Sequence, residues 1–257
     1  RHPVERTANG WKEISWLEAL DKVAAGIQSV QKKHGQNAFG IYLGNPNVHN
    51  LGGMLTIKHL LSSIKTRSRF SATSIDQLPH HIVSMHLFGH MLRIPVPDVN
   101  RTQYMLIIGG NPLASNGSIM TAPNMRQKLK DIKARDGKVV VIDPRRTETA
   151  DIASEHHFIR PATDVLLLLA MLNEIYLQGY ADKARAKNNR AAALAPEIER
   201  IADFAKDYSA ESVADITGIA ASEIKRLVKE FCEAESSVCY GRMGVSVQEF
   251  GLLSQYL

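Results

Sequence analysis

Two short apolar runs, separated by a stretch long enough for one helix, constrain the fold of this 257-residue chain more than any other feature. Tyr104–Ile108 and Lys138–Ile142 carry apolar side chains at nearly every position, which is typical of strands covered on both faces of a sheet. The interval between them predicts a helix over 125–135. Strand, helix and strand in this order predict a parallel crossover unit, and in open α/β sheets ligands bind at the carboxyl ends of such strands.

Turn residues follow the first apolar run directly. Gly109 and Gly110 allow a positive φ or the close approach of another backbone, and Pro112 prevents the strand from continuing. The polar loop 111–122 is longer than a simple turn requires, and long structured loops at strand ends commonly carry binding function. We therefore expect a ligand at this end of the sheet.

The tripeptide Gly-Asn-Pro occurs twice, at 44–46 and at 110–112, each time after an apolar run. The first copy follows a predicted strand at 39–43 and lies between predicted helices at 15–31 and 54–64. The repeated pattern predicts two α/β units, each of which offers a strand end to a ligand.

The segment between the two units gives weaker signals. Residues 68–74 are expected to form a loop, and 79–91 a helix that carries four histidines. His86 and His90 stand one helical turn apart, a spacing that zinc accepts, but no third ligand accompanies them. Packing, or a position beside a cofactor, is the preferred interpretation. The proline-rich stretch 94–98 predicts a rigid crossing between domains.

The C-terminal part predicts a helical layer followed by a return to the sheet. The helix 165–177 is apolar nearly all round and is therefore expected to be buried. Two or three helices are expected between 181 and 235, with the alanine-rich stretch 184–195 as helix or loop. A last strand at 236–240 opens into a glycine-containing turn at 241–244.

Composition describes an ordinary globular chain with a net charge of +5 and a pI near 9.2. Basic residues of 126–135 alternate with apolar ones, which indicates a solvated helix face and no nucleic-acid partner. The longest apolar run, 165–172, is much shorter than the roughly 18 residues of a membrane span. Cys232 and Cys239 lack the spacing of a metal or redox pair. We expect a cytoplasmic location, and we take the chain, which begins at Arg1, as a piece of a longer protein.

Two common phosphate-binding motifs are absent from the sequence. There is no GxxxxGK[ST], and no GxGxxG followed by an acid about 20 residues later. Asp143, at a strand end, nevertheless suits ribose hydroxyls, and Arg145, Arg146 and Thr147 suit phosphate oxygens. The alternative is a plain turn with a solvated basic pair, but the strand context favours binding.

Several segments carry a family resemblance because they occur together and in order. They are Ile14–Leu20, Gly44–Asn50, Gly109–Pro112, Val141–Ala150, Arg160–Asp164 and Tyr240–Gly251. The set resembles the molybdopterin oxidoreductases of the dimethyl-sulfoxide-reductase type, which include formate dehydrogenases and nitrate reductases. The resemblance covers essentially the whole chain. Two positions depart from the family pattern: Leu17 replaces an acid, and Ala162 replaces a glycine.

The resemblance implies a bis(molybdopterin guanine dinucleotide) cofactor that holds molybdenum or tungsten. It also implies an α/β fold of two parallel-sheet, Rossmann-like domains, the second inserted into the first. The inserted guanine-dinucleotide-binding domain is expected at 99–236, and 237–257 is expected to return to the first domain, 1–98. An iron–sulfur cluster is expected in a part of the protein that precedes this chain, and a closing domain in a part that follows it.

The cofactor-binding residues implied by the resemblance lie along one guanine dinucleotide or toward the pterin. The first group is Gly109, Asn111, Asp143, Arg145, Thr147 and Asp164, and the second is Gly244 and Gln248. Asp164 suits the ring and amino hydrogens of guanine. The protein ligand of the metal is expected within 71–81, which contains no cysteine. Ser74, Asp76, His80 and His81 are the candidates, and the catalytic residues stay unassigned.

The leading hypothesis is the central portion of an enzyme that transfers two electrons or an oxygen atom between a small-molecule substrate and the metal. Such an enzyme exchanges electrons with a further subunit or domain. The alternatives are the central domain of a thiamine-diphosphate-type enzyme and a non-catalytic scaffold subunit of an electron-transfer complex. By itself, the chain is expected to fold but to lack metal and activity.

Overall fold

The structure is a computed structural model that describes residues 1–44, 47, 49–120, 122–182 and 195–257. Most of the alanine-rich stretch 184–195 lies outside these residues. The chain divides into two compact units, 1–74 and 75–257, and each is described by itself. Both units contain parallel strands and helices, so the α/β class predicted from the sequence is confirmed.

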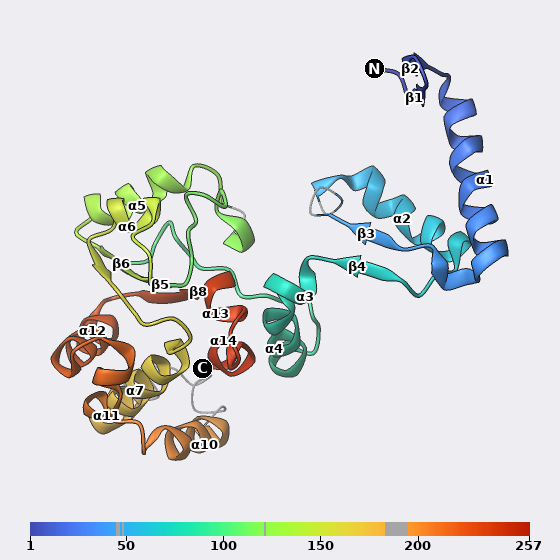
Figure 1. The fold of residues 1–257 in the computed structure, drawn as a ribbon. Coiled ribbons are helices and arrows are strands. Elements are labelled where there is room, and N and C mark those ends of the chain that lie inside the picture. The colour runs from blue at the N-terminus through green and yellow to red at the C-terminus, as the bar shows by residue number, and fades with distance from the viewer. Residues whose placement is uncertain (45–46, 48, 121, 183–194) are drawn as a thin grey trace. The chain divides into compact units, whose positions relative to one another are not determined.

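The N-terminal unit combines a small hairpin with one parallel strand pair. Its elements are β1 (Val4–Thr7), β2 (Gly10–Glu13), α1 (Trp16–His34), the 3-10 turn η1 (Gln36–Ala38), β3 (Ile41–Leu43), α2 (Leu51–Ile64) and β4 (Arg69–Ser71). β1 and β2 pair antiparallel, and β3 and β4 pair parallel (Figure 1). The expectation of a loop at 68–74 is wrong for β4. A three-residue strand shows too little alternation to be recognised, and its pairing with β3 alone defines it.

Helix α1 begins as its sequence predicts, but its apolar stripe is not covered within this unit. Ser15 caps the helix, and its hydroxyl accepts a hydrogen bond from the amide of Glu18 at 3.1 Å. The apolar side chains along the first turns remain 59–71% exposed: Trp16, Leu17, Leu20 and Val23. Among the described residues of the unit, Ile14 and Ile64 are the hydrophobic side chains buried to below a tenth.

The second unit contains a larger sheet with a helical layer on each face. Its elements are α4 (Leu78–Phe88), β5 (Tyr104–Ile108), the 3-10 turn η3 (Ser118–Met120), α5 (Met125–Ala134), β6 (Lys138–Ile142), α6 (Glu148–Ile152), β7 (Glu155–His157), α7 (Asp164–Leu177), α10 (Ala195–Ala205), α11 (Ala210–Thr217), α12 (Ala221–Glu233), β8 (Ser237–Gly241), α13 (Met243–Ser246) and α14 (Gly251–Tyr256). A short helix, α3 (Thr73–Asp76), spans the boundary with the first unit.

The four strands of the large sheet are parallel and have the order β7-β6-β5-β8. Tyr104 pairs with Lys138 and Ile108 with Ile142, so the predicted strand–helix–strand unit is confirmed. Side chains of β5 and β6 are buried on both faces and alternate between two cores. On one face, Met105, Ile107, Val139 and Val141 pack with α5, and on the other, Leu106, Ile108, Val140 and Ile142 pack with α7, α11 and α12 (Figure 1).

The last strand corrects the expected domain organisation. β8 pairs with β5, with Tyr104 opposite Ser237, whereas 237–257 was expected to leave this sheet and join 1–98. α14 packs on α4, so 75–98 lies in the same compact unit as 99–236. The sequence of a five-residue strand does not show which other strand it pairs with, because the pairing depends on contacts with distant parts of the chain. The idea of an inserted domain stays a prediction, but its boundary at 98 and its exclusion of β8 are not what the structure shows.

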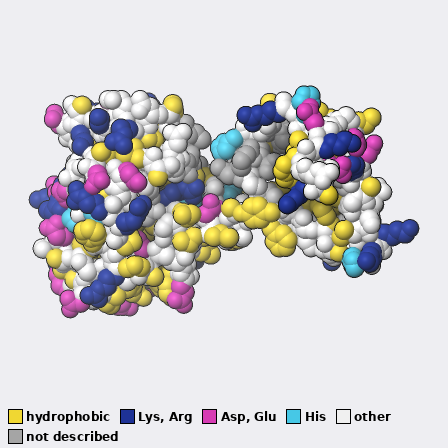
Figure 2. Space-filling view, turned by 45° about the horizontal axis from the view of Figure 1, so that its top comes forward, with side chains coloured by type: hydrophobic (Ala, Val, Ile, Leu, Met, Phe, Trp, Pro, Cys, Tyr) yellow, Lys and Arg dark blue, Asp and Glu magenta, His cyan; other side chains and the backbone are white. Residues whose placement is uncertain are grey.

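The surface of the molecule mixes charges of both signs. On the face shown in Figure 2, Lys and Arg side chains are interspersed with Asp and Glu, and hydrophobic side chains reach the surface of both units. The basic residues do not form a continuous stripe on that face. No helix within the described part of the chain has the length and apolar character that crossing a membrane requires.

Candidate functional site

The carboxyl ends of β5, β6 and β8 form one edge of the large sheet. From β5 the chain crosses first to β6 on one side, and later, through α7, α11 and α12, to β8 on the other side. The order in which strands are added to the sheet therefore reverses, and the two connections leave β5 and β8 on opposite sides of one switch point. Such a switch point leaves a crevice outside the strand ends, and that is where ligands bind in open α/β sheets.

Two glycine turns meet at this switch point. Gly109, directly after β5, has φ +56°, and its carbonyl oxygen accepts a hydrogen bond from the amide of Gly244 at 2.9 Å. A Cβ on Gly109 would lie 2.8 Å from the amide nitrogen of Val245, and a Cβ on Gly244 would lie 2.8 Å from the Gly109 oxygen. Both positions therefore require glycine, because the two backbones touch.

The loop after Gly109 is anchored to the start of α6. The Asn111 side chain donates to Glu148 Oε2 at 2.7 Å and accepts from the Thr149 hydroxyl at 2.7 Å. Thr147 is buried and caps α6, since its hydroxyl accepts from the Ala150 amide at 3.1 Å. Asn111 and Thr147 thus shape the loop through contacts within the protein. Thr149, which the sequence did not single out, completes this anchor.

Asp143 and Arg145 lie in the turn after β6. The Asp143 carboxylate accepts from the amide of Arg145 at 2.8 Å, which fixes the turn. The Arg145 guanidinium is exposed, and its Nη2 lies 4.0 Å from Glu148 Oε2. It is placed to meet an anion that approaches from solvent.

Asp164 is the first residue of α7 and is only 2% exposed. Burial raises the pKa of its carboxyl, and the negative charge of Asp143 raises it further, against a hydrogen bond from Gln248. That bond joins Gln248 Nε2 to Asp164 Oδ2 at 2.6 Å, and the same nitrogen also contacts the carbonyl of Gly244. Gln248 thus ties Asp164 to the Gly244 turn, a link that the sequence did not predict, while the expectation that Asp143 and Asp164 serve one ligand stays a prediction.

The two carboxylates have a property that points to a ligand. Among the described residues, neither Asp143 nor Asp164 forms an ion pair with Lys, Arg or His. A carboxylate without a cation partner retains acceptor capacity for neutral hydrogen-bond donors, such as sugar hydroxyls or the N–H groups of a purine. The two glycine turns and the exposed side chain of Arg145 lie at the same end of the sheet.

Two of the four candidate metal ligands, His80 and His81, already contact other groups of the protein. The two ring nitrogens of His80 contact the Gly241 oxygen at 3.2 Å and the Ser246 hydroxyl at 3.3 Å. Burial, reinforced by the charge of Arg242, lowers the pKa of His80 to about 4. His81 is buried, with Nδ1 2.9 Å from the Met91 oxygen. Both rings are thus engaged within the protein.

Ser74 is exposed and Asp76 half-buried, and both remain candidates for the metal's protein ligand. No cluster of three or more His, Cys, Asp or Glu suited to a metal occurs among the residues that the structure describes. The pair His86 and His90 accordingly gains no third partner there.

The fold defines a class: an α/β protein with a parallel sheet whose strand order reverses between β5 and β8. Comparison with known proteins identifies the family. The family model described as molybdopterin oxidoreductase matches residues 1–239, and the chain belongs to this family. This match leaves the thiamine-diphosphate alternative without support.

Known members are similar to the chain over nearly its whole length. Formate dehydrogenase H of Escherichia coli (strain K12) is 26% identical over 95% of this chain and 33% of its own. Dimethyl sulfoxide/trimethylamine N-oxide reductase of Rhodobacter capsulatus is 28% identical over 89% of this chain and 29% of its own. The solved structure of acetylene hydratase from Pelobacter acetylenicus matches with a TM-score of 0.75 at 22% identity, over 99% of this chain and 34% of that one. The chain thus spans about a third of the length of these relatives.

Proposed function

We propose that this chain is the central cofactor-binding portion of a molybdenum- or tungsten-dependent oxidoreductase, and that its large sheet binds one guanine dinucleotide of a bis(molybdopterin guanine dinucleotide) cofactor. The observation that carries the proposal is that the two glycine turns after β5 and β8 touch, with Asp164 tied to the Gly244 turn through Gln248 and Asp143 directly after the neighbouring strand β6. Family membership supplies the molybdopterin, and the site chemistry favours guanosine as the group attached to it.

Each residue has a stated task in this proposal. Asp164 accepts the ring and amino hydrogens of guanine, and Asp143 accepts the ribose hydroxyls. Arg145 pairs with a phosphate oxygen. Gly109 and Gly244 let the backbone approach the phosphates or the pterin without a side chain between them. Asn111 and Thr147 hold the loops that carry these groups.

When bound, the cofactor supplies the metal centre at which two electrons or an oxygen atom are exchanged with a small-molecule substrate. The protein contributes binding, orientation and charge. The whole enzyme is proposed to pass electrons to a further subunit or domain. One relative is named a hydratase, so the test of the proposal measures cofactor content and does not depend on the reaction.

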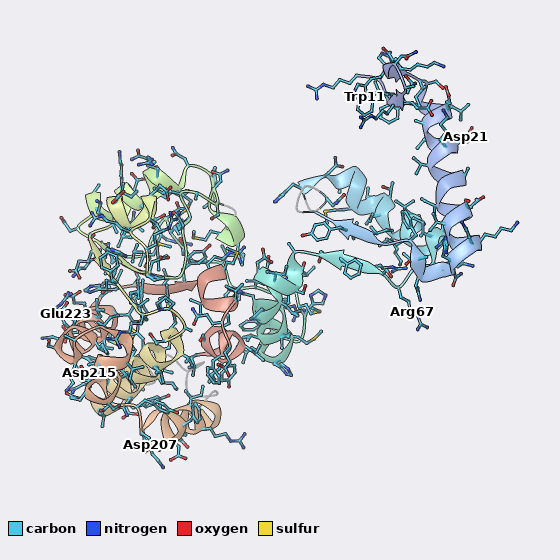
Figure 3. The ribbon with its side chains drawn as sticks, viewed as in Figure 1. Trp11, Asp21, Arg67, Asp207, Asp215 and Glu223 are labelled. Atoms are coloured by element: carbon cyan, nitrogen blue, oxygen red, sulfur yellow. The ribbon has the colours of Figure 1, made fainter. Side chains whose placement is uncertain are left out.

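The test is the amount of guanine nucleotide and of molybdenum or tungsten that the complete protein retains. Asp143→Asn and Asp164→Asn are each expected to lower both by roughly tenfold or more, because each replaces a charged hydrogen-bond acceptor at the nucleotide. Asp215→Asn, at an exposed position of α11 on the helical layer, is the matched control and should retain both (Figure 3).

Asp164→Asn also separates binding from folding. The pKa of Asp164 is raised by burial, so the charged carboxylate costs the folded state free energy, and Asn removes that cost. We expect unchanged or higher thermal stability together with lost nucleotide. Full guanine content in both variants would show that the nucleotide binds elsewhere.

A further inference from the structure

A chain of three polar side chains holds the turn that follows β8. The three side chains are His80 of α4, Ser246 of α13 and Gln255 of α14, and each contacts the next. Gln255 Nε2 lies 3.1 Å from Ser246 Oγ, Ser246 Oγ lies 3.3 Å from His80 Nδ1, and His80 Nε2 lies 3.2 Å from the Gly241 oxygen. Elements far apart in the sequence thus converge on one turn.

The chemistry of the partners fixes which group donates and which accepts in these hydrogen bonds. The Gly241 carbonyl can only accept, so Nε2 of His80 must carry a hydrogen. In a neutral ring Nδ1 is then a lone pair, which accepts the Ser246 hydroxyl hydrogen. The Ser246 oxygen in turn accepts from the Gln255 amide. Of the two neutral tautomers, only Nε2–H satisfies all three contacts, because the other tautomer would set a lone pair against the Gly241 oxygen.

The turn that is held in this way is the one that meets Gly109. The amide of Gly244 donates to the Gly109 oxygen, and the amide of Arg242 donates to the Ile108 oxygen at 3.2 Å. Ser246 is buried, so its hydroxyl has no water to replace a lost partner. His80 therefore acts at a distance on the contact between the two glycine turns.

We propose that His80 is a positioning residue, which as its neutral Nε2–H tautomer fixes the turn 241–246 so that Gly244 stays against Gly109. The hydrogen-bond geometry around His80 carries this inference. Its consequence for the cofactor rests on the proposed function: a turn that is free to move would present Gly244 to the ligand poorly.

The first test reads the tautomer and needs no ligand. In the ¹⁵N-labelled full chain, two-bond ¹H–¹⁵N spectra should show His80 Nε2 protonated and Nδ1 unprotonated at neutral pH. A ring protonated at Nδ1 alone, or at both nitrogens, would overturn the proposal, and this result does not depend on whether any variant folds.

The second test uses substitutions that separate the two hydrogen bonds. His80→Phe fills the space but makes neither bond, His80→Gln retains a donor for Gly241, and Ser246→Ala removes only the second contact. Amide exchange of Gly244 reports the turn. His80→Phe should accelerate it by roughly tenfold, since one lost hydrogen bond changes local opening by about that factor, and His80→Gln should restore most of the protection.

His86→Phe, at an exposed position of the same helix, is the control and should leave Gly244 exchange unchanged. Equal exchange rates in His80→Phe and the unaltered chain would overturn the proposal. In the complete protein, His80→Phe should lower the retained guanine nucleotide and His80→Gln should recover it. If His80→Phe retained guanine nucleotide normally while Asp164→Asn lost it, the role of His80 toward the cofactor would be rejected. The proposed function would stand.

Discussion

Ala162 has a backbone conformation that is unfavourable for a residue with a side chain. It lies in the turn before α7 and has φ +67°, a left-handed conformation that costs a residue with a Cβ about 1 kcal/mol or more. The sequence showed that alanine replaces the glycine expected from the family resemblance. The structure shows a backbone conformation at Ala162 that glycine adopts more readily than alanine, so the chain bears this strain two residues before Asp164.

Replacing Ala162 by Gly is therefore expected to stabilise the protein. Ala162→Gly should raise the free energy of unfolding by about 0.5–1 kcal/mol, the relief of strain less the entropy that glycine adds to the unfolded chain. Ala220→Gly is the matched control, because Ala220 is also exposed and precedes a helix but has φ −58°. It should be neutral or destabilising. Denaturant unfolding monitored by circular dichroism measures both, and a stability loss in Ala162→Gly would contradict the strain argument.

At the scale of elements, an ion-pair cluster joins the amino ends of β6 and β7 to α12. Lys138 contacts Glu155 and Glu230, and Arg226 contacts Glu155 and Glu230 at 2.7 and 2.6 Å. Burial alone would raise the pKa of Glu155, but hydrogen bonds from Arg226, Lys138 and His157 outweigh it and lower the pKa to about 2. The cluster lies at the edge opposite the proposed site, so it affects stability and not binding.

This cluster predicts a loss of stability in acid. A carboxylate whose folded pKa is about 2 and whose ordinary pKa is 4.5 stabilises the fold fully above pH 4.5, and the contribution is lost as the pH falls from 4.5 to 2. After allowance for solvent screening of this partly exposed group, we expect about 1 kcal/mol. Glu155→Gln should lower stability at pH 7 and flatten the pH dependence below 4.5. An unchanged slope of unfolding free energy against pH would contradict this.

What the sequence could predict at this scale depends on the length and patterning of each element. The secondary structure and burial of β5, β6 and α7 could be predicted from their long apolar runs, because these elements are covered on nearly every side. β4, with three residues, and the partner of β8 could not be read, since pairing is decided by contacts far away in the chain. For the same reason the contacts of Gln248 with Asp164 and of His80 with Gly241 could not be predicted, although the family resemblance assigned Gln248 to the cofactor site.

At the scale of the whole molecule, the two units differ in their cores. The hydrophobic clusters of the structure lie in the second unit, on the two faces of the large sheet. In the first unit the described residues bury few hydrophobic side chains, and α1 buries none. Hydrophobic stabilisation follows the apolar area removed from water, so the units are expected to differ in stability.

The first unit should therefore open before the second when the chain is studied by itself. Native-state hydrogen exchange should show amides of α1 and β3 opening at a lower free energy than amides of β5 and β6. The relevant measurement is the protection factor of each amide in increasing denaturant. If all four elements shared one opening free energy, the chain would be a single cooperative unit and this interpretation would be wrong.

The position of the guanine base in the complete, cofactor-loaded protein tests the central claim most directly. In a crystal structure or cryo-electron-microscopy map, we expect its N–H groups at hydrogen-bond distance from the Asp164 carboxylate, about 2.7–3.2 Å, with the ribose hydroxyls at Asp143. Gly109 and Gly244 should lie against the same dinucleotide. A guanine that lies elsewhere, with Asp143 and Asp164 facing only protein, would contradict the claim.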